Sequence, residues 1–276
     1  MKKHTPMEMR NPEICFQIRL LGGTTCEFTM AQTYRDLGGR TNENISHIPF
    51  DEEARNESIY EDFLHKSSKQ SRIIAICASN IIVRDIMMKA KQLGMLDTGD
   101  FVFINVDLFS SNLQRPWFAS DATKEENEVA RNAFEHVLTI SSSKSVNGNF
   151  NQFKQRVETV ASKTFNNSSA ENFVNSFVGN YYDAVKIFSS ALSEVTSRTD
   201  RSHVDGKMIT ENIWNKTHDG VFGSLNIDKN GDRKIEFSLL DLKHDKYDFE
   251  VVQVYHGAND SFQVVAKIFS LSFMMI

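Results

Sequence analysis

The residues best suited to chemistry are spread along the chain, and few have a spacing that a known reaction or metal site requires. Residues 226–231 place oxygen-bearing side chains at alternate positions before a glycine, as a calcium-binding EF-hand loop does. Counted from Asn226, however, the twelfth position is Phe237 instead of glutamate, and the flanks read as strands. We therefore interpret residues 228–232 as the turn of a β-hairpin.

Other candidate motifs have simpler structural explanations. Residues 22–25, Gly-Gly-Thr-Thr, could cradle a phosphate, but no lysine follows and the spacing is not that of a nucleotide loop. The acids of residues 51–53 fit the first turn of a helix. The eight histidines show no metal-ligand spacing, and the serines of residues 141–145 have no nearby histidine or aspartate. We expect no catalytic residue, no metal and no cofactor, so the sequence favours binding over catalysis.

Cysteines are few, and two of them have related positions. Of the three, Cys26 follows the first predicted strand and Cys77 ends the third. If those strands are neighbours, the two thiols lie within bridging reach. A bridge would close a loop of about 50 residues and stabilise the fold by roughly 4 kcal/mol. Two buried free thiols are the alternative.

Charge, hydropathy and sequons limit the possible partners and compartment. The 276 residues carry a net charge of −5 and no concentrated basic patch, so nucleic acid is not an expected partner. The sequence has no run of 18 apolar residues that could span a membrane, and we expect the chain itself to make no contact with one. No secretory signal is evident. Six glycosylation sequons nevertheless favour a secreted protein or an ectodomain. Their asparagines are Asn44, Asn56, Asn166, Asn167, Asn215 and Asn259.

The first half of the chain alternates strands and helices, which is typical of an α/β fold with a doubly wound parallel sheet. The predicted strands are residues 14–21, 45–50, 72–79 and 101–108, with helices at 24–37, 51–66 and 81–93. The run at 72–79 is apolar on both faces, as in a central parallel strand. A strand order of 2-1-3 makes the first and third strands neighbours.

The second half begins with helices and ends with short strands. Helices are predicted at 149–163, 171–197 and 207–214, and strands at 221–227, 235–242, 249–256 and 262–268. The helix at 171–197 carries apolar residues at helical spacing. They include Phe173, Phe177, Tyr181 and Phe188.

Several segments form a set of long-spaced motifs: residues 72–79, 87–94, 99–107, 130–133, 175–191, 213–217, 220–223 and 227–233. Together, and in this order, they resemble the extracellular hormone-binding domain of natriuretic peptide receptors and related receptor guanylyl cyclases. The resemblance covers residues 24–266 and implies a type I periplasmic-binding-protein-like fold. It implies a complete second lobe and a first lobe that is largely missing. The expected division is a lead-in at 1–23, second lobe at 24–142, helical part of the first lobe at 143–216, strands returning to the second lobe at 217–266 and an unmatched tail at 267–276.

The resemblance also implies site residues. Cys26 and Cys77 match the second-lobe disulfide of the family. The aromatic pair after the first cysteine, which helps to form the hormone site, is here Glu27 and Phe28, and Phe50 matches a further aromatic contact. These three residues are the expected ligand contacts.

The expected function is peptide-hormone binding by part of a single-pass receptor ectodomain on the extracellular side of the plasma membrane. The chain itself is not expected to be an enzyme, although its parent could signal through cyclic GMP or act as a clearance receptor. A receptor homodimer would form through the missing lobe, and the stripe around Tyr181 would lack its packing partner. The alternative is a module of the same superfamily that binds a small, amino-acid-like molecule.

Overall fold

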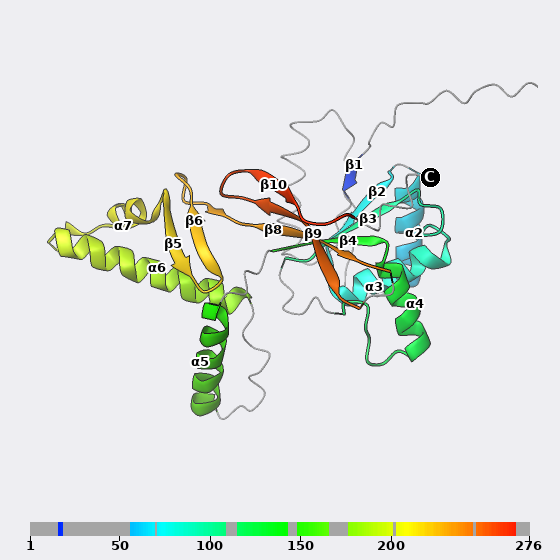
Figure 1. Cartoon of the computed structure of the whole chain (residues 1–276), viewed down its shortest axis with the longest axis horizontal. Helices are drawn as coiled ribbons and strands as arrows, with labels where there is room; N and C mark the ends of the chain where they lie inside the picture. Colours follow the sequence, from blue (N-terminus) through cyan, green and yellow to red (C-terminus); the bar gives the residue numbers. More distant parts are fainter. Residues whose placement is uncertain are drawn as a thin grey trace, which may run out of the picture. The chain divides into compact units, whose positions relative to one another are not determined.

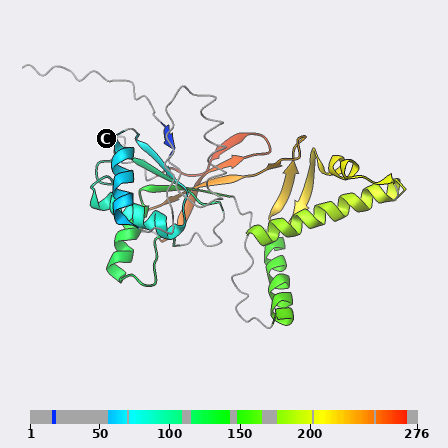
Figure 2. The same ribbon diagram turned by 180° about the vertical axis from the view of Figure 1, so that it is seen from behind.

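The computed structural model describes residues 16–18, 56–69, 71–108, 115–142, 148–165, 176–200, 203–244 and 247–268. They form two compact units (Figure 1; seen from behind in Figure 2). Among the described residues, the first unit holds those up to Val106 together with Pro116–Leu138, and the second holds Asp107, Leu108, Arg115 and the residues from Thr139 to Ile268.

The first unit is built on parallel strands. Strands β1 (Phe16–Ile18), β2 (Ile73–Ile76) and β3 (Val102–Val106) pair in that order, and both pairings are parallel. The first and third predicted strands are therefore neighbours, as the sequence indicates. The apolar run that predicts a central strand is also confirmed, because Ile74, Ala75 and Ile76 are all buried.

Three helices complete the described part of this unit. Helix α3 (Asn80–Gln92) packs against α2 (Glu57–Ser68) and α4 (Lys124–Phe134). Ser79 has the extended backbone of the N-cap of α3. The apolar faces of the three helices meet the strands in one core. Its fully buried side chains include Leu64, Ile74, Ile76, Ile82, Val83, Ile86, Met87, Phe103 and Phe134.

Helix α4 is absent from the sequence-based prediction, although its start is well marked. Thr123 Oγ1 accepts a hydrogen bond from Glu126 N at 3.1 Å, and Glu126 Oε2 accepts one from Thr123 N at 2.8 Å. This reciprocal capping box satisfies two backbone donors that a helix start otherwise leaves unpaired.

Strands with antiparallel pairings form part of the second unit. Strands β4 (Val137–Ser142), β8 (Phe237–Leu242), β9 (Phe249–His256) and β10 (Ser261–Val264) follow one another in that order. The pairs β4–β8, β8–β9 and β9–β10 are antiparallel. Strands β8, β9 and β10 match predicted strands, whereas β4 is another element that the prediction lacks. Parallel strands, antiparallel strands and helices together define a mixed α/β protein.

The second unit also contains three helices and a small sheet. The helices are α5 (Gly148–Phe165), α6 (Ser176–Arg198) and α7 (Gly206–Ile213), all near their predicted positions. Strands β5 (Lys216–Gly220), β6 (Gly223–Ile227) and β7 (Arg233–Lys234) form an antiparallel sheet of their own. Figures 1 and 2 both show β5 and β6 beside α6.

The predicted hairpin turn at residues 228–232 is confirmed, although the partner of β6 is the short β7 and not β8. Asp228 Oδ1 accepts hydrogen bonds from Asn230 N and Asp232 N at 2.8 and 2.9 Å. Gly231 has a φ of +87°, a conformation that glycine adopts without steric cost. The aspartate oxygen therefore holds the turn.

Candidate functional site

The expected ligand contacts Glu27, Phe28 and Phe50 lie outside the described residues, as does Cys26. The structure does describe β1, the strand that precedes Cys26, Glu27 and Phe28 in the sequence. Strand β1 runs parallel to β2, so the chain leaves both strands at the same edge of the sheet. Ligands of open α/β sheets bind at this edge.

Cys77 lies directly after β2 at this edge. Its side chain is 5% exposed, and its sulfur is disulfide-bonded. The chain has only two other cysteines, Cys15 and Cys26. Pairing with Cys26 stays a prediction.

The described sequon asparagines are Asn56, Asn215 and Asn259, and all three are exposed. Asn56 caps α2, Asn215 has a φ of 54° between α7 and β5, and Asn259 lies in the turn between β9 and β10. Glycosylation at these positions stays a prediction. Asn44, Asn166 and Asn167 lie outside the described residues.

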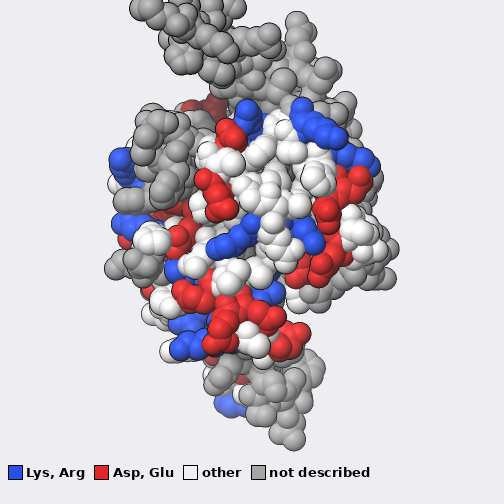
Figure 3. All heavy atoms as spheres, turned by 90° about the vertical axis from the view of Figure 1, so that its right-hand side faces the viewer, with Lys and Arg blue, Asp and Glu red and all other residues white. Residues whose placement is uncertain are grey.

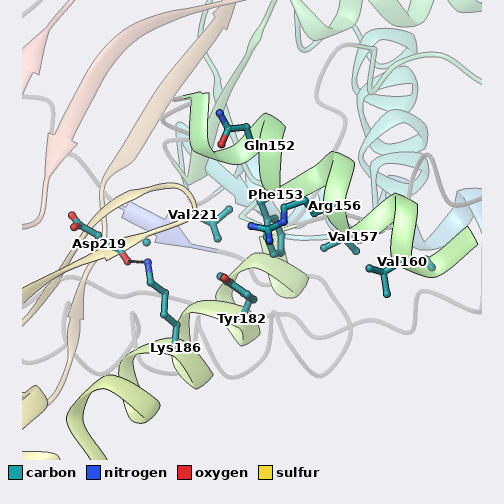
Figure 4. A pocket seen from close by; sticks show the side chains of 11 residues that line it. Gln152, Phe153, Arg156, Val157, Val160, Tyr182, Lys186, Asp219 and Val221 are labelled. Atoms are coloured by element: carbon teal, nitrogen blue, oxygen red, sulfur yellow. Dashed lines mark hydrogen bonds between the residues drawn. The ribbon is translucent and has the colours of Figure 1, made fainter. Parts of the chain in front are cut away.

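A groove of about 700 Å³ lies between α5 and α6 in the second unit (Figure 4). Helix α5 contributes most of its wall, α6 the facing wall and the β5–β6 turn one end. The lining residues are Gln152, Phe153, Arg156, Val157, Val160, Ala161, Tyr182, Lys186, Asp219, Gly220 and Val221. Sequence reasoning missed this groove, although the spacing of Phe153, Val157 and Val160 marks one face of α5.

Aromatic contacts hold the walls of the groove in place. The rings of Phe153 and Tyr182 have centroids 4.9 Å apart and join α5 to α6. The stacked rings of Phe150 and Phe222, also 4.9 Å apart, join α5 to the β5–β6 turn. Such pairs add about 0.5–1.5 kcal/mol each beyond the burial of area.

The groove offers cations to a ligand. Within the described residues Arg156 forms no ion pair, and Lys186 Nζ donates to the backbone oxygen of Asp219 at 3.0 Å. In Figure 4 the carboxylate of Asp219 points away from the aromatic wall. The groove can therefore hold an apolar side chain beside an anionic group, and it lacks an inward carboxylate for an ammonium group.

Asp183 anchors the end of the groove. Its carboxylate is 2% exposed, and both oxygens accept from Val221 N, at 2.9 and 3.0 Å. A side chain at Gly220 would come within 2.7 Å of Asp183 Oδ2, so glycine permits this close approach. Burial raises the pKa of Asp183, while the bond from Val221 lowers it by a smaller amount.

We expect the second unit to gain stability, relative to an Asp183→Asn variant, as the pH falls from 7 toward 4. The folded state raises the pKa of Asp183 above its unfolded value of about 3.9, so folding favours the protonated carboxyl. The charged form therefore destabilises the fold above the raised pKa, and this cost disappears as the pH falls through it. Thermal unfolding of both proteins at several pH values measures the effect. A difference between them that does not change with pH would contradict it.

The predicted apolar stripe on α6 is exposed in part. Tyr181, Val185 and Phe188, which share one face of the helix, are 73%, 65% and 49% exposed. The side chains of Phe173 and Phe177, also predicted in this stripe, lie outside the described part of the structure. The exposure agrees with the expectation that this face lacks a packing partner.

The described part of the chain shows neither a metal site nor a basic patch on the face drawn in Figure 3. No group of three potential metal ligands occurs among these residues. On the face shown in Figure 3, lysines and arginines are interspersed with acidic side chains and do not form a continuous basic patch. No described helix is long and apolar enough to cross a bilayer.

Comparison with known proteins identifies the family. The family described as the receptor family ligand binding region matches residues 32–245, which is most of the chain. The chain belongs to this family, and its role is therefore ligand binding by a receptor region that is not itself catalytic.

The relatives of this chain are natriuretic peptide receptors and a receptor guanylate cyclase. The chain is 36% identical over 231 residues to receptor-type guanylate cyclase gcy-28 of Caenorhabditis elegans, covering 82% of this chain and 18% of that protein. It is 31% identical to human atrial natriuretic peptide receptor 3, covering 79% and 41%. Human atrial natriuretic peptide receptor 2 is 28% identical, with 84% and 22% covered. The chain thus spans less than half the length of these relatives.

Proposed function

We propose that this chain binds a peptide hormone as part of a receptor ectodomain on the extracellular side of the plasma membrane. The observation that carries the proposal is the family match over residues 32–245, together with relatives named as receptors for a natriuretic peptide. The chain is the second lobe of the ligand-binding domain with the helices of the first. The parent receptor signals through cyclic GMP or clears the hormone, and dimerises through its first lobe.

The proposed contacts are Glu27, Phe28 and Phe50. Two aromatic side chains and a carboxylate suit a peptide that presents both apolar and cationic groups, because aromatic anchors commonly dominate peptide interfaces. The parallel pairing of β1 and β2 supports this proposal, since both strands end at the same edge of the sheet and Cys77 directly follows β2 there.

Binding of labelled atrial natriuretic peptide to the secreted chain tests this function. We expect saturable binding that free amino acids do not displace. Phe28→Ala and Phe50→Ala should each weaken it by about 10- to 100-fold, as hot-spot aromatics do.

Phe118→Ala provides the matched control, because this phenylalanine is 56% exposed in the first unit. The affinity of the Phe118→Ala chain for the peptide should be unchanged. Displacement of the peptide by a free amino acid, or equal effects of all three substitutions, would contradict the proposal.

A further inference from the structure

The sequon Asn56-Glu57-Ser58 begins α2 in a geometry that leaves its reactive atom available. Asn56 Oδ1 accepts hydrogen bonds from Ser58 N at 3.0 Å and from Ser58 Oγ at 2.9 Å. The nitrogen Nδ2, which carries the sugar in an N-linked glycan, has no hydrogen-bond partner in the described part of the chain. A glycan can therefore be attached without loss of the helix cap.

Asn56 also lines a groove in the first unit. A cavity of about 460 Å³ is lined by Asn56 and Glu57 of α2, by Met88 and Gln92 of α3 and by Glu126 of α4, among others. A second cavity of about 250 Å³ shares Arg84, Met88 and Glu126 with the first. Together the two neighbouring cavities are called the Asn56 groove.

The walls of the groove are fixed by contacts of their own. Lys89 Nζ donates to Glu57 Oε2 at 3.2 Å and bridges α3 to α2. Arg84 Nε donates to the backbone oxygen of Trp117 at 2.8 Å. A ligand therefore finds donors and acceptors already oriented, which lowers the entropic cost of binding.

The chemistry of the groove suits a neutral sugar better than an ion. Each charged side chain of the lining already has a partner within the protein: Lys89 pairs with Glu57, Arg84 lies 4.0 Å from Asp85, and Glu126 Oε2 accepts from Thr123 N. An ionic ligand would therefore have to compete with these contacts. The hydroxyl and amide groups of an N-acetylhexosamine can donate and accept along these polar walls. Its apolar acetyl methyl group can lie on the half-buried Met88.

We propose that the Asn56 groove holds the first sugars of an N-linked glycan attached to Asn56. The N-acetylglucosamine units lie along α3 between α2 and α4, against Met88 and Gln92. The inference rests on the proposed extracellular location, because only the secretory route attaches such glycans.

Asn259 provides an internal comparison in the same molecule. Ser261 Oγ donates to Asn259 Oδ1 at 2.7 Å, so its Nδ2 is available in the same way. Asn259 lies in the exposed β9–β10 turn and lines neither cavity of the Asn56 groove. The two sites therefore differ mainly in whether a groove lies beside them.

Digestion of the native secreted chain with peptide-N-glycosidase, followed by site-resolved mass spectrometry, tests the proposal. The enzyme converts each glycosylated asparagine to aspartate. We expect release at Asn56 to be about tenfold slower than at Asn259, the effect of one or two hydrogen bonds. The two rates should become equal after denaturation.

The double substitution Met88→Ala/Gln92→Ala should speed release at Asn56 alone, whereas Gln155→Ala, on an exposed position of α5, should change neither rate.

The product of the digestion gives an independent readout. Aspartate caps a helix as well as asparagine does, so deglycosylation at Asn56 leaves the cap intact. If the sugars at Asn56 contact the protein, deglycosylation should lower the unfolding temperature of the chain. An Asn56→Asp variant treated in the same way should not show this fall.

Equal release at Asn56 and Asn259, or sugar on Asn259 with none on Asn56, would overturn the inference and leave the proposed function intact. Sugar on no sequon at all would contradict the extracellular location as well. Peptide binding, measured separately, distinguishes the two failures.

Discussion

Replacing Cys77 with alanine will lower the free energy of unfolding by about 4 kcal/mol, the loop-entropy value for the loop of about 50 residues that the proposed bond to Cys26 would close. The sulfur is disulfide-bonded and buried at the end of β2. Loss of the bond increases the freedom of the unfolded chain, whereas the small cavity left by the thiol adds little. Chemical denaturation of the oxidised protein, followed by circular dichroism, measures the difference.

Two further substitutions identify the partner. If Cys26 is bonded to Cys77, Cys26→Ala should cost the same and Cys15→Ala should cost nothing. Non-reducing peptide mapping should then recover the Cys26–Cys77 crosslink. The reverse pattern, with Cys15→Ala as the costly variant, would show that the predicted pairing is wrong.

Replacing Phe134 with alanine will destabilise the first unit by about 3–5 kcal/mol, the usual range for a buried phenylalanine. The side chain is 0% exposed at the end of α4, and its ring lies 6.0 Å from that of Trp117 at 58°. Truncation removes buried apolar area and opens a cavity that the capped helix cannot readily close. Urea denaturation of both proteins gives the loss directly.

Phe118→Ala is the control for this loss. Its side chain is 56% exposed, so the change should stay within about 0.5 kcal/mol. A loss below 1 kcal/mol for Phe134→Ala would mean that α4 does not pack on the core as the structure shows.

The elements that could be predicted from sequence are those with strong periodicity or continuous apolar character. The run at residues 72–79 gave β2, and the strand–helix alternation placed β1 beside it. Strand β9 and helices α5 to α7 also agree with their predicted positions. In each case the local pattern and the tertiary environment favour the same structure.

Other elements lacked such a pattern. Strand β5, Lys-Thr-His-Asp-Gly, is polar: three of its five residues are exposed, His218 is partly buried and Gly220 is buried. Pairing with β6, rather than hydrophobicity, therefore defines this strand. Helix α4 did carry a readable signal, the Thr123–Glu126 capping box, which lies outside the apolar segments. Strand β4 follows α4 closely and has no turn residues to mark its start.

The site was predictable to a smaller extent. The family resemblance pointed to Cys77, which is disulfide-bonded, and to an exposed stripe that includes Tyr181 and Phe188. The groove between α5 and α6 and the Asn56 groove were not predictable, because each needs side chains from two or three separate elements. Only the folded arrangement of those elements brings such residues together.

Photo-crosslinking of the secreted chain with labelled atrial natriuretic peptide tests the proposed peptide site most directly. The peptide should label Glu27, Phe28 or Phe50 in a saturable manner, and excess unlabelled peptide should suppress the labelling. Free amino acids should have no effect. Labelling that does not saturate, or that a free amino acid suppresses, would contradict a peptide-hormone site in this chain.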